Sequence, residues 1–262
     1  MIQRITSMYF SPTHTTKAIV TGVCKGLQSA LSVDSQEVDL TLPGGRQALP
    51  SFGEGDLLVL GLPVYAGRIP LLMAEYLRAL SGKGAWAIPL VVYGNRDYDD
   101  ALLEVADILA DGGFTVLSAG AFIGEHSFTN KVATGRPDET DRSLCEKFGA
   151  DSAALLLNPI KKPTPPTIRG NRPYKERNPS PPMGPHTTDA CTHCGICPTV
   201  CPTAAIDFSD ETQVEESLCL RCCACVKSCP EGAKHFPQEG MQNSIIFLID
   251  SCSDYREPEL FL

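Results

Sequence analysis

Two cysteine-rich stretches decide the organisation of the chain: CTHCGICPTVCP, residues 191–202, and its near repeat CLRCCACVKSCP, residues 219–230. Together they hold nine of the twelve cysteines, and both follow the pattern C-x2-C-x2-C-x3-C-P. Three thiolates with this spacing lie around one face of an iron-sulfur cubane, and the fourth cysteine binds the other cluster. The spacing therefore predicts two 4Fe-4S clusters that join the two stretches.

The predicted ligand sets are crossed, because each cluster takes three cysteines of one stretch and the last cysteine of the other. The sets are Cys191, Cys194, Cys197 and Cys229 for the first cluster, and Cys219, Cys222, Cys225 and Cys201 for the second. A zinc site is the alternative, but it uses separated C-x2-C pairs, which two successive three-cysteine runs do not fit. Cys223 would break the spacing as a ligand, so we expect a small residue beside a cluster.

Residues 189–237, including CPTAAI and CPEGAKHF after the fourth cysteines, resemble a bacterial two-cluster ferredoxin domain. The resemblance implies a small α+β domain. Its few large apolar side chains leave most of the stabilisation to metal bonds. We therefore expect this domain to lose its fold without iron and sulfide.

Residues 1–157 alternate short β-rich runs with helical patterns, which is typical of a parallel sheet covered on both faces. The predicted strands lie at 2–10, 33–40, 56–61, 86–93 and 114–123. The predicted helices lie at 14–30, 70–81, 98–111 and 139–157. This pattern favours an α/β fold with a flavodoxin-like doubly wound five-stranded parallel sheet, which binds its ligand outside the carboxyl ends of the strands.

The loop after the first predicted strand, FSPTHTTKAIV at residues 10–20, places hydroxyl residues before an apolar helix. Hydroxyls and the N–H groups of a helix N-terminus form an anion site, although Ser and Thr also serve as N-caps. The segment resembles the FMN phosphate loop of flavodoxins, S/T-x-T-G-x-T, which implies FMN contacts from Ser11, Thr13, Thr15 and Thr16. His14 stands where that family has glycine, so a positive φ there would be tolerated at some cost, and its imidazole could donate to the phosphate.

Two further loops, GLPVYAGRIP at residues 61–70 and VYGNRDYDDAL at residues 91–102, resemble flavin loops of flavodoxin-like proteins. The resemblance implies two tyrosine walls around the isoalloxazine ring and a flexible peptide near its N5 atom. The residues expected to bind FMN here are Pro63, Val64, Tyr65, Ala66, Gly67, Gly94, Asn95, Arg96 and Tyr98. Each tyrosine alone would more often be a packing residue, so the prediction depends on three loops that meet at one sheet edge. No G-x-G-x-x-G supports a nicotinamide site.

Residues 158–188 contain nine prolines and six Lys or Arg against one Glu, which is typical of a stiff basic linker. It is either a solvated connector or a segment that lies across acidic surfaces and fixes the domain geometry. Residues 238–262 form a tail that we expect to pack back on a domain, because its apolar stretch would cost free energy if it were exposed to water. The long connection at 126–141 could roof the flavin, bind a substrate or dock the cysteine-rich domain.

The formal net charge of -9 argues against binding nucleic acid. The chain has no run of about 20 apolar residues and no signal-peptide pattern at its start, so we expect no membrane span and a cytoplasmic location. In that reducing compartment, closely spaced cysteines favour metal ligation over disulfides.

The two halves together resemble the fused flavodoxin and ferredoxin proteins of anaerobes, which implies an iron-sulfur flavoprotein. Clusters pass single electrons and FMN handles one or two, so the expected function is electron transfer between the clusters, FMN and redox partner proteins, such as a ferredoxin-type donor or an oxidoreductase. The alternative is an FMN-dependent reductase of a small-molecule acceptor; a regulatory protein with a vestigial flavin site is the third. No acid-base pair identifies catalytic residues, and a homo-oligomer is possible.

Overall fold

The structure, a computed structural model, describes residues 2–158, 160, 163–177 and 181–262. Residue 1 of the first predicted domain and residues 159, 161–162 and 178–180 of the predicted linker lie outside the described residues. The main sheet has parallel strands in the order β2-β1-β3-β4-β6. They are β1 (Arg4–Tyr9), β2 (Ser35–Asp39), β3 (Asp56–Pro63), β4 (Trp86–Tyr93) and β6 (Ala119–Ile123). This order is that of the flavodoxin-like doubly wound fold, so the predicted fold class is confirmed.

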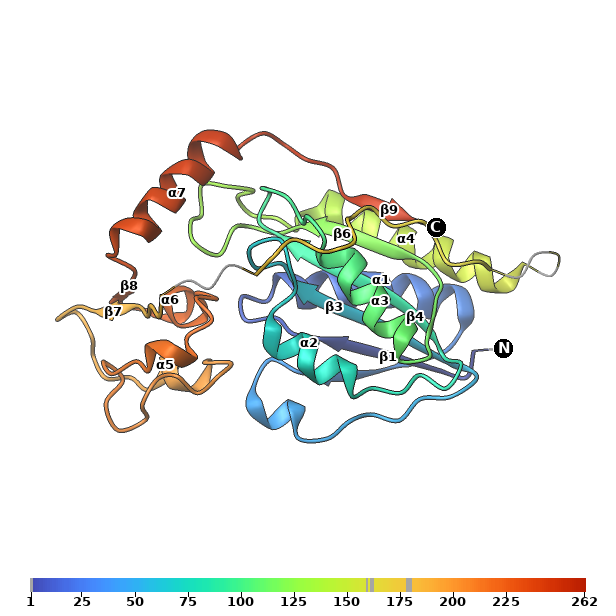
Figure 1. The fold of residues 1–262 in the computed structure, drawn as a ribbon, viewed down its shortest axis with the longest axis horizontal. Coiled ribbons are helices and arrows are strands. Elements are labelled where there is room, and N and C mark those ends of the chain that lie inside the picture. Colours follow the sequence, from blue (N-terminus) through green and yellow to red (C-terminus); the bar gives the residue numbers. More distant parts are fainter. Residues whose placement is uncertain (1, 159, 161–162, 178–180) are drawn as a thin grey trace.

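Helices cover both faces of the sheet (Figure 1). They are α1 (Thr15–Leu31) and α4 (Glu139–Leu157) on one face, and α2 (Leu71–Arg78) and α3 (Ala101–Asp111) on the other. Successive side chains of a strand point to opposite faces, so the buried run of β3 supplies both cores. Leu58 and Leu60 pack with α2 and α3, whereas Leu57 and Val59 pack with α1 and α4.

The helices of this domain begin and end near the predicted positions for identifiable reasons. α4 has a capping box in which the N–H of Asp141 donates to Asp138 Oδ1 at 3.0 Å and the N–H of Asp138 donates to Asp141 Oδ2 at 2.9 Å. α1 approaches α4 closely, since a Cβ at Gly26 would overlap the Glu146 carbonyl. Cys24 and Cys145 are buried between these helices as small apolar side chains.

The sheet has seven strands, whereas the sequence predicts five. The predicted strand at 114–123 is divided into β5 (Thr115–Val116) and β6, and the Ser118 hydroxyl between them lies 2.7 Å from the Ser152 hydroxyl of α4. The seventh strand, β9 (Glu259–Phe261), pairs antiparallel with β6. A strand of three residues is too short to show the alternation of apolar and polar residues that predicts a strand from the sequence.

The cysteine-rich domain consists of short elements arranged as two similar halves. They are β7 (His186–Thr187), α5 (Ile196–Thr199), η2 (Glu216–Leu218), α6 (Ala224–Ser228) and β8 (Lys234–His235). Positive φ angles recur at positions 28 residues apart, in the pairs His193 and Arg221, Gly195 and Cys223, and Ala204 and Gly232. Cys223, with φ 62°, is therefore the counterpart of a glycine at the N-cap of α6, and its buried side chain packs against Phe236 and Met241.

The predicted linker lies across the acidic surface of the first domain. We call its described part, residues 163–177, the basic strap. Its ion pairs are Arg169–Asp97 at 2.8 Å, Arg172–Asp107 at 2.5 Å, Lys175–Asp99 at 2.9 Å and Arg177–Glu104 at 2.7 Å. The sequence allowed either a solvated connector or a segment that lies across acidic surfaces. The ion pairs of the basic strap agree with the second interpretation.

The tail connects the two domains. α7 (Glu239–Ser251) starts beside the cysteine-rich domain, and the chain then returns to the sheet as β9 (Figure 1). The side-chain amide of Gln238 donates to the Gly184 carbonyl at 2.8 Å, and Gln242 donates to the Phe236 carbonyl at 2.6 Å. Among the described residues, none of the helices combines the length and apolar character needed to cross a membrane.

Candidate cofactor sites

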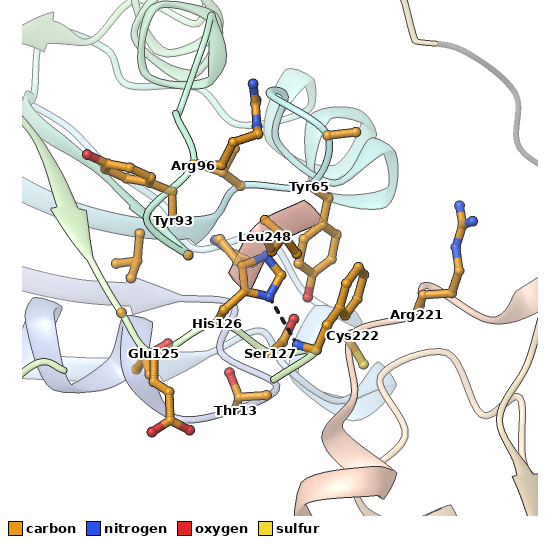
Figure 2. A pocket seen from close by; sticks show the side chains of 18 of the residues that line it. Thr13, Tyr65, Tyr93, Arg96, Glu125, His126, Ser127, Arg221, Cys222 and Leu248 are labelled. Carbon is orange, nitrogen blue, oxygen red and sulfur yellow. Dashed lines mark hydrogen bonds between the residues drawn. The ribbon is translucent and has the colours of Figure 1, made fainter. Parts of the chain in front are cut away.

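A cavity of about 630 Å³ lies between the first domain and the cysteine-rich domain (Figure 2). Loops at the carboxyl ends of β1, β3, β4 and β6 form its floor, and residues of the cysteine-rich domain and of α7 close it. This is the sheet edge at which doubly wound folds bind ligands, and the volume suits one cofactor-sized molecule. We call it the interdomain cavity.

The first loop contributes Pro12, Thr13, Thr15 and Thr16 to the cavity. His14 has φ 66°, so the position does adopt the left-handed conformation that favours glycine. Two predicted FMN ligands lie elsewhere: His14 is exposed, and the Ser11 hydroxyl accepts the Lys17 N–H at 3.0 Å within the loop. Ser11 therefore shapes the start of α1 and does not line the cavity.

The second loop lines the cavity with all its predicted residues, Pro63 to Gly67. Tyr65 and Arg68 exchange backbone hydrogen bonds at 2.8 and 3.1 Å around a turn whose central residues, Ala66 and Gly67, both have positive φ. A Cβ at Gly67 would overlap the Asp99 carboxylate, so this turn needs glycine. Burial, with the nearby Cys222 and Cys223 thiols, raises the pKa of the Tyr65 phenol well above its usual range.

The third loop differs from the prediction. Gly94 and Arg96 line the cavity, but Asn95 and Tyr98 do not. The Asn95 amide donates to the tail carbonyls of Cys252 at 2.6 Å and Asp254 at 2.7 Å, and the Tyr98 hydroxyl donates to Glu259 at 2.6 Å. These residues therefore hold the tail. Tyr93, at the end of β4, borders the cavity from this side, but its ring is buried and packs against Tyr98, with centroids 5.6 Å apart.

Sequence reasoning missed two parts of the cavity wall. The loop after β6 supplies Gly124, Glu125, His126, Ser127 and Phe128, and α7 supplies Asn243, Ser244, Phe247 and Leu248. The connection at 126–141 was expected to roof the flavin, bind a substrate or dock the cysteine-rich domain, and the sequence did not separate these three. The apolar stretch of the tail predicted packing, but nothing in it indicated a helix over a cavity.

The cysteine-rich domain contains two small pockets lined by cysteines. The first is bordered by Cys191, Cys194, Cys197 and Cys229, and the second by Cys201, Cys219, Cys222, Cys225 and the extra Cys223. Three cysteines of one stretch thus meet the fourth cysteine of the other in each pocket. Within the described residues, no group of three or more His, Cys, Asp or Glu is placed to hold a single metal ion.

The donor chemistry of these pockets fits iron-sulfur clusters. Each has thiols around a hollow, and backbone N–H groups point at sulfur from equivalent places: Ala205 to Cys201 at 3.2 Å and Ala233 to Cys229 at 3.3 Å. Hydrogen bonds to sulfur are a means by which proteins tune cluster potentials. Burial raises the pKa of the Cys222 thiol to about 12, so metal binding there would have to release a proton.

The interdomain cavity and the second cysteine pocket share a wall. Leu220, Arg221 and Cys222 border both. Two contacts hold this wall in place: the Lys227 ammonium of α6 lies 2.7 Å from Glu125, and the Arg46 guanidinium of η1 (Pro43–Arg46) donates to the Pro202 carbonyl at 2.6 Å. The pocket therefore abuts the cavity within one chain.

The chemistry of the cavity fits FMN. Thr13, Thr15 and Thr16 offer hydroxyls beside the N-terminus of a long helix, which suits a phosphate. Tyr65 offers aromatic surface, and the exposed Ala66 peptide of the second loop borders the same space. Phosphate-binding and ring-binding groups are thus present in one cavity of suitable size.

No family model matches the sequence. Over 73 residues the chain is 37% identical to the thiosulfate reductase electron transfer subunit PhsB of Salmonella typhi; the match covers 26% of this chain and 35% of that protein. The chain thus spans about a third of the length of this curated relative.

Among solved structures, a flavodoxin from the domain Archaea is 18% identical, with a TM-score of 0.44, 60% of this chain covered and 100% of that one. The Flv1 flavodiiron core of Synechocystis sp. PCC6803 is 16% identical, with a TM-score of 0.43 and coverage of 59% and 36%. The class that the strand order defines is an α/β protein with a flavodoxin-like sheet, here followed by a cysteine-rich domain.

Proposed function

We propose that the chain is an iron-sulfur flavoprotein that transfers electrons between two 4Fe-4S clusters and FMN, and onward to a redox partner protein. The observation that carries this proposal is the shared wall: Cys222 borders both the second cysteine pocket and the interdomain cavity. FMN supplies a group that accepts or releases one or two electrons, whereas each cluster exchanges one. A cysteine ligand between the two sites gives electrons a short route inside one chain.

The roles of the residues follow from their positions. Cys191, Cys194, Cys197 and Cys229 would hold the first cluster, and Cys201, Cys219, Cys222 and Cys225 the second. Cys194 is exposed, so the first cluster is the one that a partner such as a ferredoxin-type donor or an oxidoreductase would reach. The three threonines of the first loop would hold the FMN phosphate, and Tyr65 would bound its ring.

Anaerobic purification followed by quantitation of iron, sulfide and FMN tests the composition. We expect about eight iron atoms and one FMN per chain. The variant Cys229→Ala should damage the cluster of the first stretch, Cys201→Ala that of the second, and Cys24→Ala, in a buried site between α1 and α4, should leave iron content unchanged. Zinc, or four iron atoms or fewer in the unsubstituted chain, would contradict the cluster assignment.

Reduction of a small molecule is the second candidate function. It is favoured by polar groups that line the cavity and that electron transfer between cofactors does not use, namely Ser127, Asn243, Ser244 and Arg221. Turnover of a panel of small acceptors by the reduced protein, abolished by Ser244→Leu, would support it. If the reduced protein is oxidised by partner proteins and by none of the small acceptors, electron transfer remains the proposed function.

A further inference from the structure

His126 lines the interdomain cavity from the loop after β6 and is held in a defined place (Figure 2). Its ring lies against Gly94, where a Cβ would overlap the imidazole. The Phe128 ring packs near it, with centroids 5.1 Å apart and planes tilted by 60°. The glycine that the sequence assigned to flavin approach thus makes room for a histidine.

One hydrogen bond fixes the tautomer of this imidazole. The backbone N–H of Phe128 donates to His126 Nδ1 at 3.1 Å, shown as the dashed line in Figure 2. Because a backbone N–H only donates, Nδ1 carries no proton, and the neutral ring must carry its proton on Nε2. Burial, together with the Lys227 ammonium, lowers the pKa of His126 to about 4, so the ring is neutral at physiological pH.

The Nε2–H group has no acceptor in the described part of the chain. In that part of the chain, the side-chain atoms that are fully buried and lack a hydrogen-bond partner are Asn95 Oδ1 and Gln238 Oε1. His126 Nε2 is not one of them, so this atom remains accessible from the cavity. An N–H donor that lines a cavity and has no protein acceptor can donate to a ligand in that cavity. The charged groups near it form a pair of their own, Lys227 with Glu125, and do not compete for it.

We propose that His126 donates an Nε2–H hydrogen bond to an acceptor atom of the ring system of the bound flavin. This inference rests on the proposed function. Hydrogen bonds to flavin ring atoms tune its electronics, and an acceptor that gains electron density on reduction is bound more tightly by a fixed donor. His126 therefore binds the flavin and favours its reduced form.

The test uses the full-length, iron-loaded protein with FMN. His126→Phe removes the donor, His126→Asn keeps a side-chain N–H, and His186→Phe makes the same change at an exposed histidine of the cysteine-rich domain that does not line the cavity. The FMN Kd is measured by fluorescence quenching, and the FMN midpoint potential by anaerobic spectroelectrochemical titration. Iron content and thermal midpoint confirm that each variant is folded.

We expect His126→Phe to weaken FMN binding about tenfold, the loss of one hydrogen bond, and to shift the potential to more negative values. His126→Asn should recover part of both, and His186→Phe should change neither. Unchanged Kd and potential in His126→Phe would overturn the proposal. Failure of every protein, including the unsubstituted one, to bind FMN would instead contradict the proposed function.

Discussion

The two domains are stabilised in opposite ways. The flavodoxin-like domain has two extensive apolar cores, one on each face of its sheet, with fully buried side chains such as Leu58 and Phe148. The cysteine-rich domain has few large buried apolar side chains, chiefly Ile206 and Phe236, and its other buried apolar positions are mostly alanine and cysteine. Hydrophobic burial can fold the first domain unaided, whereas the second buries little apolar surface, and we expect the proposed clusters to supply most of its stability. The tail, which includes α7, connects the two domains.

Removal of iron should separate the two domains most clearly. Anaerobic chelation should abolish amide exchange protection in residues 183–237 and leave the central strands β1, β3 and β4 protected, because the proposed metal bonds lie only in the cysteine-rich domain. Hydrogen exchange with mass spectrometry measures both regions in one sample. Loss of protection in β3 and β4 to the same extent would show that the sheet is not independent.

Loss of the tail anchor should have an intermediate effect. In Asn95→Ala, the buried carbonyl of Cys252 and the partly buried carbonyl of Asp254 lose their donor, which should cost about 1–3 kcal/mol and increase hydrogen exchange in α7 and β9. Because α7 lines the interdomain cavity, FMN binding should weaken as well.

Asn130→Ala is a matched control, since it removes the same side-chain amide from an exposed position in the loop after β6. Denaturant unfolding gives the change in free energy. If Asn95→Ala has the stability of Asn130→Ala, the tail is held by β9 and not by this amide.

The ion pair between the domains should have the smallest effect. Burial alone would raise the pKa of Glu125, but the Lys227 ammonium and the Gly135 N–H outweigh it and lower the pKa below its ordinary value of 4.5. A lowered folded pKa adds stability above pH 4.5 that is lost as the pH falls through the folded value. A double-mutant cycle of Glu125→Gln and Lys227→Met should give a coupling of about 0.2–1 kcal/mol at pH 7.

The same cycle at a pH below the folded pKa of Glu125 should give a coupling near zero, because the protonated carboxyl no longer attracts the ammonium. High salt should also reduce it, since the pair is partly exposed. A coupling that persists at low pH would mean that the two side chains interact by packing instead of charge.

Local patterns predicted what depends on local sequence. The alternation of apolar residues gave the strands and helices of the first domain, and the spacing of the cysteines predicted two mixed sets that lie together in the structure. The departure at His14 raised the question of a positive φ at that position, and the structure has one, at 66°. In each case the determinant lies within a few residues along the chain.

The parts that the sequence did not predict depend on contacts between distant segments. Asn95 and Tyr98 were expected to bind FMN, but the tail, about 160 residues later, occupies their side chains. The roof formed by α7 and the place of His126 depend on how the domains meet, and no local pattern encodes this. Cys223 could be explained only when its φ angle paired it with Gly195.

The short strand β9 also protects the protein from self-association. Without it, β6 would be an edge strand with unpaired N–H and C=O groups, which can template pairing with another chain. β9 covers residues 119–121 of that edge, and Pro258 and Glu259 at its start are residue types that discourage further strand addition. β9 therefore covers part of an edge at which another strand could pair.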